Sequence, residues 1–201
     1  MGTALLARGL RGPAPEWNLS HPEVVRAVHL AHVAAGAELV LTNTFVGASP
    51  EEAAAALSLA RASGARFVAA SLWAGLPDLP RQIAQLAKAD AVWLETATSA
   101  PQAIAAVRTA AAHTLLPIVV TCAMTRAPLA ALREAGAAAA GYNCAPWPDD
   151  ATADVLKPDS AGLDPADWAA RLGGGALPRL AGGCCGTTAG HLAALRARRR
   201  S

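Results

Sequence analysis

The stretch that decides the fold is Asp90–Met124, which reads DAVWLETATSAPQAIAAVRTAAAHTLLPIVVTCAM. Its first part, Asp90–Ala97, is a short apolar run, and its last part, Pro117–Met124, is another. Between them lies Ala100–His113, an alanine-rich segment with helical spacing that opens with a capping serine and a proline. This order predicts a strand, a helix and a second strand, which is the βαβ unit of a parallel sheet.

The same alternation extends from Glu38 to the C-terminus. Apolar runs predict seven strands, at Glu38–Phe45, Arg66–Trp73, Asp90–Ala97, Pro117–Met124, Ala137–Cys144, Ala153–Asp159 and Pro178–Cys185. Helical spacing predicts seven helices, at His21–Ala35, Pro50–Ser63, Leu79–Lys88, Ala100–His113, Pro128–Ala135, Pro165–Leu172 and Thr188–Arg199. Strands that alternate with helices favour an α/β fold, and seven strands with a helix after most of them suggest a TIM-like barrel.

Length, composition and charge narrow the class of protein. A chain of 201 residues is enough for one sizeable domain and short for two, so we expect a single domain over residues 1–201. Apolar residues make up 53% of the chain, but much of this is alanine, and no uninterrupted window of about 18 strongly apolar residues predicts a membrane span. Met1–Gly12 lacks the apolar core of a signal peptide, which favours a cytoplasmic protein. A net charge of +2 is too small to indicate nucleic-acid binding.

Two adjacent cysteines lie in the glycine-rich run Gly182–Thr188, which reads GGCCGTT. Neighbouring side chains on a strand point to opposite faces, so Cys184 and Cys185 can face one point only if the backbone turns, and the flanking glycines permit this. A metal ion is a natural shared point, although a tight turn in the core would also suit the pair. Cys144, at the end of an earlier apolar run, supplies a third thiol. Three thiolates leave one position of a tetrahedral zinc ion open, as in a catalytic site.

These motifs resemble those of a known family. Gly182–Thr187, Gly141–Cys144 (GYNC) and Thr42–Phe45 (TNTF) are together similar to segments of the zinc-dependent homocysteine S-methyltransferases. That family includes betaine- and S-methylmethionine-dependent enzymes and the homocysteine domain of cobalamin-dependent methionine synthase. Further matches follow in chain order, at Met1–Thr3, Asn18–Val25 and Leu94–Thr96. The resemblance implies a homocysteine-binding (β/α)8 barrel with a zinc ion held by Cys144, Cys184 and Cys185.

The resemblance also implies a reaction. Zinc would bind the thiol of homocysteine and hold it as a thiolate, which would take a methyl group from a donor to give methionine without a protein base. The donor stays open among S-methylmethionine, S-adenosylmethionine, betaine and a methyl-corrinoid carried by a partner protein. Two other hypotheses remain, namely that the acceptor is another thiol or a selenol, and that the chain is a non-catalytic zinc-binding subunit.

The chain departs from the family at its start. In the family a first strand ends in Asp-Gly-x-Met-Gly-Thr, whereas this sequence begins at Met1-Gly2-Thr3. We therefore expect a trimmed TIM-like barrel whose first strand is missing or incomplete, and which is open, completed by another chain or preceded by further residues. An exposed seam of this kind favours self-association, so a homo-oligomer is expected.

Polar residues at the predicted strand ends are candidates for substrate binding, because the C-terminal ends of barrel strands meet on one face. Glu95 lies in an apolar run and needs a partner. By resemblance it holds the amino group of homocysteine, and the alternative is a salt bridge to an arginine. Thr187 and Thr188 are expected to cap the last helix, whose N-terminus would receive the substrate carboxylate. Asn43 and Thr44 are expected to line the pocket or to form a turn.

Several other residues are expected to serve packing. Cys122 has no ligand motif around it and is interpreted as a core residue. His29 and His32 are three apart on a predicted helix and are interpreted as surface or packing residues. Tyr142 is expected to pack beside Cys144, and core packing is favoured for Trp93 over a role in binding a cationic donor.

Overall fold

All seven predicted strands are present, with tighter bounds. A computed structural model of the chain describes residues 1–144, 147, 150–172 and 177–199. The strands are β1 (Leu39–Leu41), β2 (Phe67–Trp73), β3 (Ala91–Ala97), β4 (Ile118–Cys122), β5 (Ala139–Asn143), β6 (Val155–Lys157) and β7 (Leu180–Ala181). They form one sheet in chain order, and every neighbouring pair is parallel.

The seven predicted helices are also present, each within a few residues of its expected bounds. They are α3 (Pro22–Ala34), α4 (Pro50–Arg61), α5 (Leu79–Gln85), α6 (Ala100–His113), α7 (Leu129–Glu134), α8 (Pro165–Leu172) and α9 (Ala189–Arg198). Three short N-terminal elements were missing from the sequence-based prediction, namely α1 (Gly2–Leu6), the 3₁₀ turn η1 (Ala14–Glu16) and α2 (Trp17–Ser20). Elements of three to five residues are too short to show a helical period, which explains why the pattern did not predict them.

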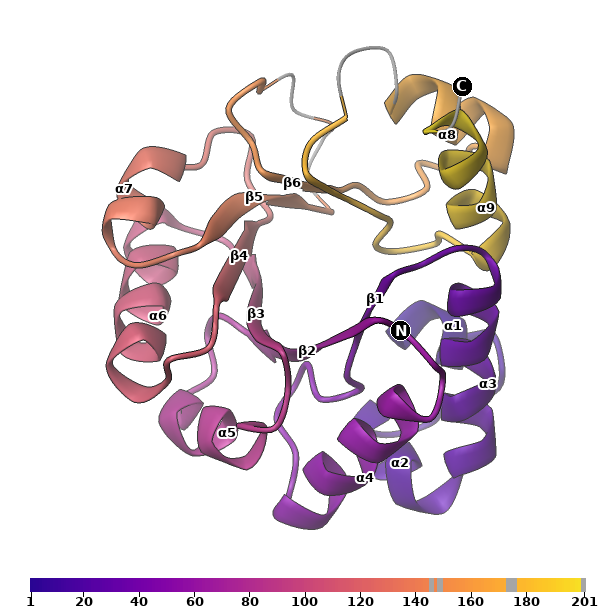
Figure 1. Cartoon of the computed structure of the whole chain (residues 1–201), viewed down its shortest axis with the longest axis horizontal. Coiled ribbons are helices and arrows are strands. Elements are labelled where there is room, and N and C mark those ends of the chain that lie inside the picture. Colours follow the sequence, from indigo (N-terminus) through magenta and orange to yellow (C-terminus); the bar gives the residue numbers. More distant parts are fainter. Residues whose placement is uncertain (145–146, 148–149, 173–176, 200–201) are drawn as a thin grey trace.

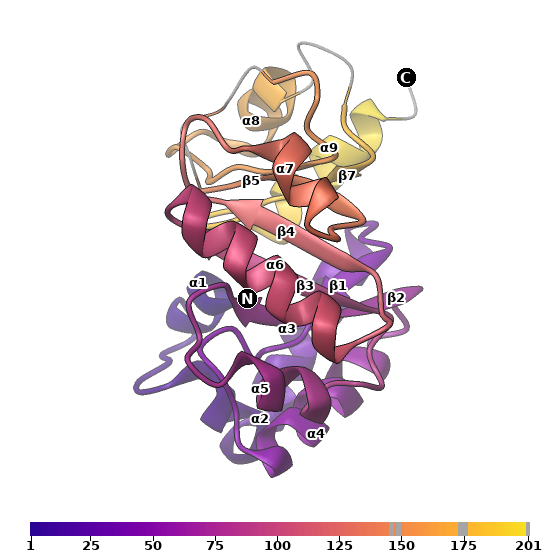
Figure 2. The same cartoon turned by 90° about the vertical axis from the view of Figure 1, so that its left-hand side faces the viewer.

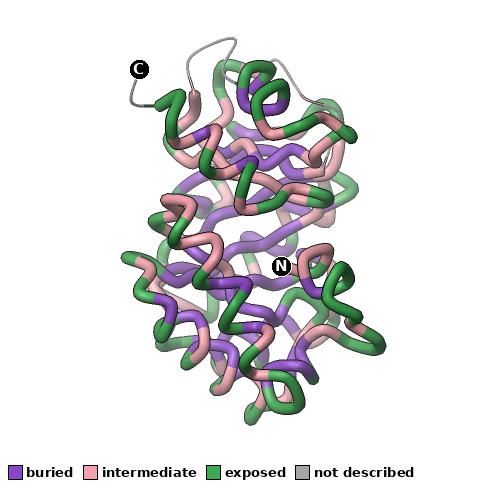
Figure 3. Tube along the Cα trace, turned by 90° about the vertical axis from the view of Figure 1, so that its right-hand side faces the viewer, coloured by how far each residue is buried: buried purple, intermediate pink, exposed green. Residues whose placement is uncertain are grey.

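The sheet curves into a wall with helices around its outer side (Figures 1 and 2). The central strands are buried on both faces, as parallel strands covered on both sides should be (Figure 3). The outer face packs against the helices in the main apolar core, which includes Leu72, Leu94 and Val120. The inner face has its own cluster of mostly small side chains, made by Ala69, Ala91, Trp93, Val119, Ala139 and Val155. The structure is therefore a trimmed, TIM-like α/β barrel.

The barrel is open between its two end strands. In the sheet order β1 and β7 are the outermost strands, and in the described part of the chain they do not pair with each other. Helices α3 and α9 lie side by side across this gap (Figure 1). Arg196 of α9 donates to Glu38, just before β1, with Nη1 and Oε1 2.9 Å apart. The seam is thus bridged by helices and side chains in place of a strand ladder.

The described helices offer no membrane span, since none of them combines sufficient length with sufficient apolar character. The longest of them, α6, has 14 residues.

Gly141 is needed where β5 meets β6. It pairs with Val155 across the two strands, and a Cβ at Gly141 would collide with the Val155 main-chain oxygen. We expect Gly141→Ala to lower the free energy of unfolding by about 1–3 kcal/mol, because the extra methyl group forces the two strands apart. Urea titration measures this change. Gly2→Ala is the matched control, since a Cβ there meets nothing within 4 Å, and equal stability losses in the two variants would contradict the prediction.

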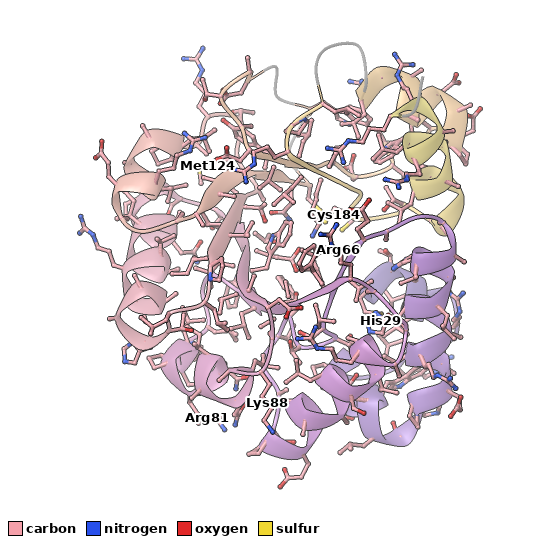
Figure 4. The ribbon with its side chains drawn as sticks, viewed as in Figure 1. His29, Arg66, Arg81, Lys88, Met124 and Cys184 are labelled. Carbon is pink, nitrogen blue, oxygen red and sulfur yellow. The ribbon has the colours of Figure 1, made fainter. Side chains whose placement is uncertain are left out.

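His29 on α3 is fully buried, so of the two roles expected for it, surface or packing, it has the packing role. Both of its ring nitrogens lack a hydrogen-bond partner. It faces the interior from α3 (Figure 4). Burial, with a smaller effect of His32, lowers the pKa of His29 to about 3. A histidine whose folded-state pKa is depressed binds its proton more readily when unfolded, so its contribution to stability is present above about pH 6.5 and is lost as the pH falls.

The expected result is that His29→Leu weakens the acid sensitivity of folding. Between about pH 7.5 and about pH 5 the wild-type protein should lose about 2 kcal/mol of unfolding free energy through His29 alone. The leucine variant should lose that much less over the same interval. Urea titrations at the two pH values measure the difference, and parallel stability curves for wild type and variant would show that His29 is not the responsible group.

Candidate active site

The three thiols meet at the C-terminal ends of strands that are far apart in the sequence. Cys144 directly follows β5, while Cys184 and Cys185 come three and four residues after the end of β7. The Sγ atom of Cys144 lies 2.7 Å from that of Cys184 and 3.2 Å from that of Cys185. Cys184 lies on the inner side of the ring of elements (Figure 4). The cluster offers one ligand atom from each residue, all within 4.8 Å of one another, so it could hold a metal ion.

The backbone turns at both ends of the cluster to make this possible. Cys144 has a φ of 52°, a backbone angle that few residues other than glycine adopt. Gly186 also has a positive φ, of 74°, directly after the cysteine pair. At Gly183 a Cβ would collide with the side chain of Thr187. The expectation that glycines permit both adjacent cysteines to face one point therefore agrees with the local geometry.

The three sulfur atoms of the cluster shift one another's pKa in opposite directions. Hydrogen bonds from Cys144 and Cys185 are the main reason that the pKa of Cys184 is lowered, and the charge of Lys157 adds to the effect. The pKa of Cys144 and that of Cys185 are raised, because each thiol donates to Cys184 and is partly desolvated. The remaining thiol, Cys122, is buried on β4 away from the cluster, and burial raises its pKa to about 11. Cys122 is thus a core residue, as its sequence context indicated.

A second polar group lies on the inner face of the sheet, where Glu95 of β3 is held by two neighbours. Ser71 of β2 donates to Glu95 with Oγ and Oε1 2.5 Å apart. Lys157 of β6 forms an ion pair with Glu95, with Nζ and Oε2 2.6 Å apart, and both side chains are only 10% exposed. The Lys157 ammonium also lies 4.9 Å from the centre of the Trp93 ring. Glu95 therefore has its partner within the protein.

This ion pair corrects one expectation and adds two residues that the sequence did not single out. The alternative partner of Glu95 was an arginine, but the structure shows a lysine 62 residues away in the chain. Lys157 is one of only two lysines in the sequence and lies near the end of a predicted strand, and Ser71 interrupts an apolar strand. The rarity of lysine and the polar residue within an apolar strand could therefore have identified Lys157 and Ser71 from the sequence. Glu95 also lies inside β3, not at its end, because β3 continues to Ala97.

Asn43 and Thr44, the second and third residues after β1, form hydrogen bonds within the protein. Asn43 donates from Nδ2 to the Ala14 carbonyl at 2.7 Å and to Asn18 Oδ1 at 3.1 Å, so it holds the N-terminal segment against the barrel. Thr44 is fully buried and donates to the Ser71 carbonyl at 2.8 Å. Asn43 borders the central cavity, whereas Thr44 does not.

The start of α9 is capped by side chains of the same segment. Thr188 is the N-cap residue, and its backbone N–H donates to Nδ1 of His191 at 3.2 Å. Thr187 donates from its hydroxyl to the Cys184 carbonyl at 2.7 Å. His191 is buried and also contacts the Leu163 carbonyl through Nε2, at 3.1 Å. These bonds connect the helix start to the thiol cluster.

Asn143 joins the thiol cluster to a strained point of β3. The ladder between β3 and β4 shifts register after Leu94, and Thr96 has a φ of 62°. Asn143 accepts from the Thr96 N–H at 3.1 Å and donates to the Thr96 hydroxyl at 2.9 Å. The same amide nitrogen lies 3.7 Å from Cys184 Sγ. Tyr142, one residue earlier, is buried in the outer core and donates to Asp150 at 2.6 Å.

A cavity of about 760 Å³ links these groups. Its wall includes the three cysteines of the cluster together with Glu95, Lys157 and Trp93. It continues along the open seam, between β1 and β7 and past α3 and α9. The fold and the site together define a class of protein, namely a parallel α/β barrel that gathers three thiols beside a cavity at the C-terminal ends of its strands.

Comparison with protein families agrees with this class. A family described as Homocysteine S-methyltransferase matches residues 1–74 and 78–199. The chain belongs to the homocysteine S-methyltransferase family. No curated protein gives a significant match to the sequence.

Solved structures show the same fold at low sequence identity. The apo form of the homocysteine methyltransferase MmuM from Escherichia coli is 22% identical, with a TM-score of 0.77 over 98% of this chain and 93% of that chain. Its metallated form is 21% identical with the same TM-score and coverage. Its oxidised form is 20% identical, with a TM-score of 0.75 and again the same coverage. At these identities the likeness supports the fold.

Proposed function

We propose that this protein is a zinc-dependent methyltransferase that moves a methyl group to the thiol of homocysteine and so forms methionine. The observation that carries the proposal is the meeting of Cys144, Cys184 and Cys185 beside a cavity that also contains buried charged groups. Family membership supports homocysteine as the acceptor. Reduced thiols at such a site suit a reducing compartment, so we place the reaction in the cytoplasm.

The donor set suits zinc. Three thiolates in reach of one point match the ligands that zinc prefers, and they leave a fourth position for a substrate. Zinc bound there would supply Lewis-acid chemistry that keeps an acceptor thiol deprotonated near neutral pH. The chain's own residues orient these ligands. The glycines around Cys184 permit the turn, and Asn143 holds the sulfur of Cys184 with its amide.

We propose that the polar groups around the cluster position the acceptor. Glu95 would contact the amino group with lone pairs that Ser71 and Lys157 leave free, since a carboxylate has about four acceptor sites. Thr187 and Asn43 would contribute by shaping the walls next to Cys184 and β1. Thr44 would act indirectly, by fixing the end of β1 through its hydrogen bond to Ser71.

The open side of the barrel bears on the donor and on assembly. The cavity extends along the seam, so a small sulfonium or ammonium donor and a methyl-corrinoid on a partner protein both remain candidates.

The end strands β1 and β7 have no strand beside them on the seam side in the described residues, and unpaired strand edges favour association. We expect the purified protein to form a homo-oligomer. Light scattering coupled to size-exclusion chromatography measures this, and a clean monomer would contradict it.

Methyl transfer tests the proposed function directly. Zinc-loaded protein is incubated with homocysteine and, in turn, S-methylmethionine, S-adenosylmethionine, betaine or a methyl-corrinoid protein, and methionine is measured by mass spectrometry. We expect methionine with one of these donors. Methylation of a different thiol or of a selenol would instead identify another acceptor. Tight zinc binding without any methyl transfer would support a non-catalytic zinc-binding subunit and contradict the proposal.

A further inference from the structure

The ion pair at Glu95 bears on how the site recognises its acceptor. One carboxylate oxygen accepts from Ser71 and the other from Lys157. An ammonium of the protein therefore already occupies a position beside this carboxylate. A substrate ammonium would meet a charge that is balanced, and it would gain less than at an unpaired carboxylate.

Lys157 has hydrogen-bonding capacity that Glu95 does not use. An ammonium group carries three N–H donors, and one of them is directed to Glu95. The Trp93 ring lies on another side of it, 4.9 Å away. Lys157 borders the cavity, and its carbonyl accepts from the Cys144 N–H at 3.2 Å, so its strand end adjoins the thiol cluster. The ammonium is thus held next to the place where a thiol substrate would bind.

The start of α9 is an alternative site for an acidic group of the acceptor, but two polar donors beside it already form hydrogen bonds within the protein. The start of α9 could in principle receive a carboxylate through its free N–H groups. However, the Thr188 N–H donates to His191, and the Thr187 hydroxyl donates to the Cys184 carbonyl. These two donors are engaged within the protein, whereas Lys157 offers a full positive charge at the wall of the cavity.

We propose that Lys157 binds the carboxylate of the acceptor, so that the site selects small thiols that carry a carboxylate and gains only little further affinity from the contact between their amino group and the already paired Glu95. This inference rests on the proposed function, because the acceptor thiol must bind at the three cysteines. Glu95 then acts as a positioning residue. Its ion pair holds the Lys157 ammonium in place beside the cavity, where a hydrogen bond to a carboxylate is charge-assisted and strong.

Three related thiols separate the contributions of the two charged groups. They are homocysteine, 4-mercaptobutyrate, which lacks the amino group, and 3-aminopropanethiol, which lacks the carboxylate. Isothermal titration calorimetry on the zinc-loaded protein gives a dissociation constant for each. For the wild type we expect 4-mercaptobutyrate to bind within about threefold of homocysteine, and 3-aminopropanethiol to bind about 10- to 100-fold more weakly.

Two variants assign this preference to Lys157. Lys157→Met should weaken the binding of 4-mercaptobutyrate by about 10- to 100-fold. It should not weaken the binding of 3-aminopropanethiol, because the ammonium of this ligand then meets an unpaired Glu95 carboxylate. The double variant Glu95→Gln/Lys157→Met has no unpaired buried charge, so it keeps the test valid if the single variant is unstable. It should show the same loss of preference for a carboxylate.

The outcomes distinguish the inference from the function on which it rests. If the wild type binds the aminothiol as tightly as homocysteine, or if the double variant keeps the preference for a carboxylate, Lys157 is only a structural partner of Glu95 and the inference is overturned. If zinc-loaded wild type binds none of the three thiols, the proposed function itself fails, and the inference fails with it.

Discussion

Serine in place of Cys184 is expected to abolish stable zinc binding and to reduce methyl transfer to background. Cys184 is the central sulfur of the cluster, since both other thiols donate to it. Its loss leaves two thiols, which are too few for a stable site of this type. The loss of affinity should exceed the roughly 10- to 100-fold effect of changing an outer partner of a metal ligand. Zinc per chain is measured by plasma mass spectrometry after dialysis, together with methionine formation.

Two further variants make this test specific. Cys122→Ala removes the buried core thiol on β4, so it should leave zinc content and methyl transfer unchanged. Asn143→Ala removes the amide next to Cys184 and should weaken zinc binding by an intermediate amount, about 10- to 100-fold. A Cys184→Ser protein that retains one tightly bound zinc ion per chain would refute the three-thiol site.

The second large effect is expected at the buried ion pair. Glu95→Gln should lower the free energy of unfolding by about 3–5 kcal/mol, because it leaves the Lys157 ammonium without a counter-charge in a site that is only 10% exposed. The amide keeps the size of the side chain, so lost packing cannot account for the effect. Urea or guanidinium titration measures it.

The matched control for this prediction removes both charges. Glu95→Gln/Lys157→Met leaves no unpaired ion, and replacing a whole buried pair by groups of similar volume is often neutral or stabilising. The double variant should therefore recover most of the stability that the single variant loses. Equal stability of Glu95→Gln and wild type would mean that the pair is well solvated and does not contribute to folding.

The order of strands and helices could be predicted from the sequence because it depends on local patterns. Short apolar runs such as Pro117–Met124 and helical segments such as Ala100–His113 carry their own period, and βα units place them in a parallel sheet. The strand bounds were less accurate. The runs expected at Glu38–Phe45 and Pro178–Cys185 contain strands of only three and two residues, because pairing ends where the chain turns into the site. The short N-terminal helices carried no pattern to detect.

The candidate site was predictable where a motif identified it. The glycine-flanked pair Cys184 and Cys185 and the distant Cys144 required a common partner, and the barrel brings all three together. The roles expected of Asn43 and Thr44 were harder to derive, because either pocket lining or a turn suited their positions. The structure shows that Asn43 anchors the N-terminal segment and that Thr44 is buried behind the cavity wall.

The sequence by itself determined the α/β class, the order of the elements, the family resemblance and the three thiols, since each of these depends on residues close together in the chain or on a compact motif. Only the tertiary structure decided which charges meet. Glu95 pairs with Lys157 across 62 residues because β3 and β6 both direct their inner face to the same interior, and this depends on strand register and on the curvature of the whole sheet. No local pattern contains that information, so the groups that would recognise an acceptor became visible only in the folded barrel.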